Sequence, residues 1–200
     1  EDVDGIMKSY EMIDDVVSGL VDEGIPPERI VLGGFSMGGA MALQVACRSP
    51  RPFAGYFAMS SFMGPASVQW RKLGVDWSQE TGAAGASEGG EGGEWHLGWS
   101  ARHTPDPSLA QDPGSKLAPM MVCHGKDDGL IDWRWGDMTR RGLEMAGADV
   151  AWRAYDGLDH ELGEREIGEL AEWIEGRLAT KQPAEPKKGK DEPMAIAAAD

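Results

Sequence analysis

Residues 30–43 read IVLGGFSMGGAMAL, and this stretch decides the fold. An apolar run leads into Gly34, a phenylalanine and Ser36, and a helix-forming run that is apolar on almost every side follows. A short apolar run is typical of a strand inside a parallel sheet, and an all-round apolar helix is typical of a buried one. We therefore predict a strand over 29–35 and a buried helix over 37–48, with Ser36 at the sharp turn between them.

Strand and helix patterns alternate along the rest of the chain. Helical spacing of apolar residues precedes Gly24, and further strands are expected at 53–59, 119–124 and 150–155. Further helices are expected at 133–146 and in the stretch that ends at Leu178. This alternation predicts an α/β fold with a mostly parallel sheet and helices on both faces.

The composition divides the chain into one domain, an insertion and a tail. We expect a catalytic domain over 1–178 with a flexible insertion at about 64–117, because residues 81–93 read TGAAGASEGGEGG and are too polar to pack. Trp70 and Trp77 flank that segment and are expected either to cover apolar surface or to pack loosely. Residues 179–200 are rich in Pro, Lys and Ala and are expected to be disordered.

The net charge of the chain argues against nucleic acids and anionic membranes as partners. The 200 residues carry a formal net charge of −15, and an acidic body repels nucleic acid phosphates and anionic lipid headgroups. No apolar run approaches the roughly 20 residues that span a bilayer, so stable membrane insertion is not expected. The two cysteines, Cys47 and Cys123, lie in apolar runs, which favours a reducing compartment over a disulfide framework.

The turn at Ser36 has the pattern of a nucleophile elbow. Gly34 and Gly38 flank the serine, and such an elbow is expected to need positions without a Cβ because its backbone turns sharply. The helix that follows would point free N–H groups at the site, and the Met37 N–H is predicted to donate to an oxyanion. A phosphate-binding turn is the alternative, but GGFSMGG matches neither G-x-G-x-x-G nor a P-loop.

A serine nucleophile needs a base, and His160 is in the expected place. In this fold the acid and then the histidine follow the serine along the chain, and His160 lies in the loop after the last strand. His96 and His103 fall in the insertion, where no rigid element would hold them. His124 closes a strand and is expected to be a hydrogen-bonded structural histidine.

The acid is expected in the loop HGKDDGLID, which follows the preceding strand. That loop offers Asp127, Asp128 and Asp132, and spacing alone leaves Asp127 and Asp128 as alternatives. Asp159 adjoins His160, but neighbouring side chains of an extended loop diverge, so Asp159 is a poor candidate for orienting the imidazole.

Three motifs in order resemble one known family. GIPPERIVLGGFSMGGAMAL, HGKDDGLI and YDGLDHELG are similar to the serine, acid and histidine motifs of the acyl-protein thioesterase and lysophospholipase group of α/β-hydrolases. The resemblance selects Asp128 as the acid and gives a Ser36–His160–Asp128 triad. It implies a cytoplasmic serine hydrolase of carboxylic esters or thioesters that acts through an acyl-enzyme, on small acyl esters or acylated proteins. It implies no metal and no organic cofactor.

Two departures from the family pattern affect this interpretation. Thioesterases usually carry Gln after the serine, and Met37, with SSFM at 60–63 and HEL at 160–162, is more similar to the lysophospholipase-like branch, which favours shorter acyl groups. The family also has further strands and an oxyanion loop before the elbow, so N-terminal strands are expected to be missing here. The alternatives are a catalytically impaired binding module and a dienelactone-hydrolase-like enzyme, although the latter carries Cys at the nucleophile position.

Overall fold

The computed structural model describes residues 2–65, 67–75, 77 and 117–179 of the chain. The expected flexible stretch at 81–93, with His96 and His103, lies outside the described residues. The expected disordered tail also lies outside them, apart from residue 179.

Four strands form the described sheet, β1 (Val31–Phe35), β2 (Gly55–Met59), β3 (Met120–Gly125) and β4 (Val150–Tyr155). Their order is β1-β2-β3-β4, and every neighbouring pair is parallel. The predicted parallel α/β sheet is therefore confirmed. The strand expected to begin at 29 begins at Val31 because the residues before it form a short 3₁₀ helix, Pro27–Arg29. The carboxyl ends of all four strands point to one edge of the sheet, where the loops that carry Ser36, Asp128 and His160 begin.

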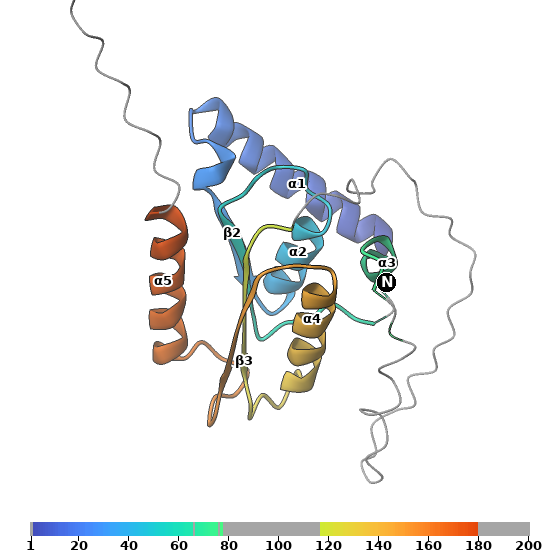
Figure 1. Cartoon of the computed structure of the whole chain (residues 1–200), viewed down its shortest axis with the longest axis vertical. Coiled ribbons are helices and arrows are strands. Elements are labelled where there is room, and N and C mark those ends of the chain that lie inside the picture. Colours follow the sequence, from blue (N-terminus) through green and yellow to red (C-terminus); the bar gives the residue numbers. More distant parts are fainter. Residues whose placement is uncertain (1, 66, 76, 78–116, 180–200) are drawn as a thin grey trace, which may run out of the picture.

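Helices cover both faces of the sheet, as Figure 1 shows. On one side are α1 (Val3–Asp22), α2 (Met37–Ala46), α3 (Val68–Lys72) and α4 (Trp133–Met145), and on the other is α5 (Glu164–Ala179). The period-2 alternation of β3 explains the two layers. Val122 packs into the cluster that holds α1, α2 and α4, whereas Cys123 packs with Leu170 of α5.

Helix α2 is buried along its second half and exposed at its first two residues. Residues 42–46 are buried against the sheet and α1, as its apolar sequence predicts. The expectation of an all-round buried helix is wrong for its first turn, because Met37 is 84% exposed and Gly38 is exposed too. The open N-terminal turn leaves Ser36 accessible from solvent.

The beginning of the expected insertion is part of the core. Helix α3 starts after Ser67, whose hydroxyl accepts a hydrogen bond from the backbone N–H of Gln69. Trp70 is only 1% exposed, packs edge-to-face on Trp77, and donates its indole N–H to the Gly64 carbonyl at 2.9 Å. Of the two expectations for these tryptophans, covering apolar surface is the correct one for Trp70, because its buried ring lies against Gly142 of α4.

The two glycines of the elbow differ in what they require. A Cβ on Gly34 would lie 2.5 Å from the Gly38 carbonyl carbon, whereas a Cβ on Gly38 would meet no described atom within 4 Å. The expectation that both positions exclude a Cβ is therefore wrong for Gly38. Gly39 is the second crowded position, since its Cβ would lie 2.8 Å from the Gly34 carbonyl oxygen.

We expect Gly34→Ala to lower the free energy of unfolding by about 1 to 3 kcal/mol, because the backbone of the elbow has to move. Gly38→Ala is the matched control and should be neutral or slightly stabilising, because alanine is the better helix former. Chemical denaturation of the two variants measures the difference. Equal losses would contradict the steric account.

Candidate active site

Ser36 lies between β1 and α2 in a backbone conformation that side chains rarely adopt. Its φ is 52° and its ψ is −121°. A non-glycine residue with this φ costs on the order of 1 to 3 kcal/mol and persists only where its surroundings enforce it. The Ser36 N–H donates to the Met59 carbonyl at 2.9 Å, which ties the turn to the end of β2. The result is a hydroxyl held at the carboxyl edge of the sheet.

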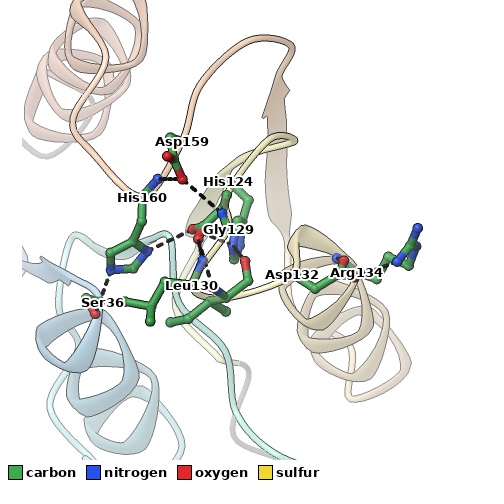
Figure 2. A network of polar contacts seen from close by, with 10 residues as sticks. Ser36, His124, Gly129, Leu130, Asp132, Arg134, Asp159 and His160 are labelled. Atoms are coloured by element: carbon green, nitrogen blue, oxygen red, sulfur yellow. Dashed lines mark hydrogen bonds and ion pairs between the residues drawn. The ribbon is translucent and has the colours of Figure 1, made fainter. Parts of the chain in front are cut away.

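His160 lies in the loop between β4 and α5 and reaches the serine. Its Nε2 lies 3.1 Å from Ser36 Oγ, and its ring packs against Phe35 with centroids 4.8 Å apart. Its Nδ1 lies 2.8 Å from Asp128 Oδ2, and a carboxylate only accepts, so Nδ1 carries the hydrogen. Nε2 is then free to accept a proton from Ser36 (Figure 2).

Asp128 follows β3, and its side chain is fully buried. Oδ1 accepts hydrogen bonds from the backbone N–H groups of Leu130 at 2.9 Å and Ile131 at 2.7 Å. Burial alone would raise the pKa of this carboxyl, but the hydrogen bonds from Ile131, His160 and Leu130 outweigh it and lower the pKa below 3.8. Asp128 is therefore a fixed negative charge beside the imidazole at neutral pH.

The other acids of this loop have different positions. Asp127 is exposed. Asp132 caps α4, because its side chain accepts from the Arg134 N–H at 2.9 Å and pairs with the Arg134 guanidinium (Figure 2). The geometry thus brings Asp128 to His160, and the choice that spacing left open between Asp127 and Asp128 falls on the second. Its catalytic role stays a prediction.

Asp159 joins the acid loop to the histidine loop. Its Oδ1 accepts hydrogen bonds from the backbone N–H of Gly129 at 2.9 Å and from that of His160 at 2.7 Å (Figure 2). These two N–H donors lower the pKa of the Asp159 carboxyl. Asp159 contacts the backbone of His160 and not its imidazole, in line with the sequence argument against it as the orienting acid. The bridge itself had no signal in the sequence, because it depends on how two distant loops meet.

We expect Asp159→Ala to lower kcat for ester hydrolysis by about tenfold to 10²-fold, because the imidazole is less well placed when the two loops separate. Asp159→Asn keeps a carbonyl oxygen at the accepting position and should stay within a few-fold of the parent. Steady-state kinetics on a short ester compare the two variants. Equal losses of activity in both variants would contradict this account. They would show that the negative charge of Asp159, and not its hydrogen bonds to Gly129 and His160, supports catalysis.

Met37 is the first residue of α2, and the backbone N–H groups of a first helical turn have no acceptor within the helix. This position beside Ser36 suits the predicted oxyanion donor. That role stays a prediction. The Met37 side chain points into solvent, and so does Leu130 beside Asp128, at 84% and 73% exposed. Large apolar side chains therefore border the loops that hold the serine and the acid.

Comparison of the sequence with known proteins finds a family model and curated relatives that are similar to this chain. The family model described as Phospholipase/Carboxylesterase matches residues 1–73, which include Ser36 but neither Asp128 nor His160. Lysophospholipase-like protein 1 of Mus musculus is 31% identical over 86% of this chain and 58% of its own length. Acyl-protein thioesterase 1 of Gibberella zeae is 27% identical over 90% of this chain and 62% of its own length. The chain thus spans less than two thirds of these relatives.

Comparison of the structure gives the fold. The crystal structure of SOBER1 from Arabidopsis thaliana superposes with a TM-score of 0.64 at 20% sequence identity, covering 88% of this chain and 66% of that one. At that identity the likeness establishes the fold alone. The expected α/β-hydrolase fold is confirmed, and so is the resemblance to the thioesterase and lysophospholipase group.

Proposed function

We propose that the chain is a serine hydrolase of carboxylic esters or thioesters, on the ground of its geometry and of its similarity to the acyl-protein thioesterase and lysophospholipase group of α/β-hydrolases. The observation that carries the proposal is the unbroken path from Ser36 Oγ to His160 Nε2, 3.1 Å, and from His160 Nδ1 to Asp128 Oδ2, 2.8 Å. Three residues from distant parts of the chain form this path, in which Ser36 faces His160 Nε2 and His160 Nδ1 faces the Asp128 carboxylate.

The proposed reaction has two halves. Ser36 Oγ attacks the carbonyl carbon of the substrate while His160 Nε2 takes the hydroxyl proton, and the imidazolium is stabilised by the Asp128 carboxylate. The carbonyl oxygen becomes an oxyanion beside the first turn of α2, where the Met37 N–H donates to it. His160 then returns the proton to the departing alcohol or thiol. Water attacks the acyl-serine by the same steps and frees the acid.

The substrate class proposed is an acyl ester or thioester of a small molecule or a protein. The names of the relatives, a lysophospholipase-like protein and an acyl-protein thioesterase, support acylated substrates. The exposed Met37 and Leu130 side chains supply apolar surface close to the site. Met37 in place of the glutamine usual in thioesterases supports the lysophospholipase-like branch and shorter acyl groups.

We also propose a cytoplasmic location, on the ground that Cys47 and Cys123 are buried free thiols. Among the described residues, no helix has the length and apolar character that crossing a membrane requires.

Trapping of the acyl-enzyme tests the proposed function. The protein, expressed from its complete gene, is mixed with a p-nitrophenyl ester, and a burst of p-nitrophenol close to one equivalent per enzyme is expected. Mass spectrometry should place the acyl group on the peptide that contains Ser36. Parallel assays with acyl thioesters of increasing chain length rank the substrates. Turnover without an acylated Ser36 would overturn the serine mechanism, and absence of turnover and of labelling would favour a binding module.

A further inference from the structure

His124 is a buried histidine that touches the triad acid without belonging to the triad. It lies in β3, is fully buried, and its Nε2 lies 2.9 Å from the Ile131 carbonyl oxygen and 3.2 Å from Asp128 Oδ2. Figure 2 shows the ring on the opposite side of the acid loop from Ser36. Oδ2 of Asp128 therefore has two imidazole neighbours, one from β3 and one from the histidine loop.

The surroundings of His124 fix which of its nitrogens carries hydrogen. Both neighbours of Nε2 are acceptors, so Nε2 is a donor. Nδ1 is buried and has no hydrogen-bond partner among the described residues, and it lies against α4, where a Cβ on Gly136 would come within 2.5 Å of it. A second hydrogen on Nδ1 would be buried without an acceptor. Burial likewise lowers the pKa of His124, against the opposing effect of the hydrogen bond to Ile131 and of Asp128.

We propose that His124 is a positioning residue for the triad acid: its Nε2–H, which donates to the Ile131 carbonyl, also lies 3.2 Å from Asp128 Oδ2 and keeps that oxygen in line with His160 Nδ1. The inference rests on the proposed function, because it assigns a task within the same site. Oδ1 of Asp128 is held by the backbone of its own loop, so His124 and His160 share Oδ2. Without His124, the Asp128 carboxylate would have a single imidazole neighbour. His160 alone would then fix the position of Oδ2 and share its negative charge.

The proposal predicts a shift in pH dependence with a definite sign. A carboxylate that loses one donor stabilises the imidazolium form of its remaining partner more strongly, so His160 would hold its proton to higher pH. The groups that face this centre among the described residues are His124 and His160 on Asp128, with the exposed carboxylate of Asp159 nearby. The acid limb of the kcat/KM profile should therefore move upward when the His124 donor is removed.

His124→Phe and His124→Gln separate positioning from packing. Phenylalanine keeps a buried ring without the donor, and we expect kcat/KM to fall by about tenfold to 10²-fold and the acid limb to rise by about half a unit to one unit. Glutamine places an N–H near the Nε2 position and should restore both in large part. Cys123→Ala is the matched control, because it disturbs the opposite face of β3 and should lower the melting temperature without moving the limb.

If the unmutated protein is an active hydrolase, three results would overturn the proposal. They are an unmoved limb in His124→Phe, a His124→Gln variant that behaves like His124→Phe, or a limb shift in Cys123→Ala of the same size. If the phenylalanine variant does not fold, ¹⁵N NMR of the inactive Ser36→Ala protein decides the matter. His124 should show the Nε2–H tautomer and no titration between pH 5 and 9, and a titrating ring or an Nδ1–H tautomer would refute the proposal. If the unmutated protein shows no turnover and no acylation of Ser36, the proposed function is refuted instead. The tautomer and titration of His124 in the NMR experiment then test the proposal for His124 separately.

Discussion

Ser36→Ala is expected to lower kcat for ester hydrolysis by about 10⁶-fold, because the variant lacks the hydroxyl proposed as the nucleophile. His160 Nε2 lies 3.1 Å from Ser36 Oγ, so removing the oxygen removes the atom that forms the covalent bond. The fold should survive, since alanine removes one oxygen of a half-buried side chain and keeps the backbone bond to Met59. Burst kinetics and labelling with a fluorophosphonate probe measure the loss.

Ser60→Ala is a close control for this variant. Ser60 also ends a strand with a positive φ, 45°, but it is fully buried and no described group accepts from its hydroxyl. It should keep activity within a few-fold and label fully. Labelling that persists in Ser36→Ala, or that disappears in Ser60→Ala while the protein stays folded, would show that Ser36 is not the nucleophile.

Asp128→Asn should lower kcat by about 10³-fold to 10⁴-fold with little change in the fold. Both carboxylate oxygens accept from donors, Oδ1 from two backbone N–H groups and Oδ2 from His160, with the His124 Nε2–H also 3.2 Å from Oδ2, so an amide nitrogen fits neither position well. Placed toward His160, the amide donates to Nδ1 and forces the hydrogen onto Nε2. That tautomer cannot take the proton of Ser36.

Asp127→Asn is the matched control for the acid. The two residues are neighbours in sequence, but Asp127 is exposed and Asp128 is buried at the imidazole, so the Asp127 variant should lose no more than a few-fold. Despite burial, hydrogen bonds from Ile131, His160 and Leu130 lower the pKa of Asp128 from its ordinary acidic value, so the difference between the two variants should hold across the neutral pH range. Equal losses at the two positions would mean that neither has been identified as the acid.

Much of the fold follows from local sequence pattern. The apolar runs that became β1 to β4 are short and bounded by turn residues, and the helices between them have apolar faces of helical period, so the parallel sheet could be predicted. Helix α3 could not, because its five residues are too few to show a period and Trp70 is buried against α4, a helix distant in sequence. The sequence could not show either that a Cβ fits at Gly38, since this depends on which atoms surround the elbow.

The sequence by itself determined the types of residue at the site and their order, a serine in a strand–turn–helix, then an acidic loop, then a histidine loop. These are local features, and the chain order of the three motifs is the same in any conformation. The tertiary structure decided which acid meets His160, because Asp127 and Asp128 differ only in the direction that the end of β3 gives their side chains. It alone revealed the Asp159 bridge, because a hydrogen bond between distant loops depends on distances that no spacing along the chain encodes. It also revealed the contact of His124 with Asp128, because that contact depends on how the loop after β3 turns back on the strand.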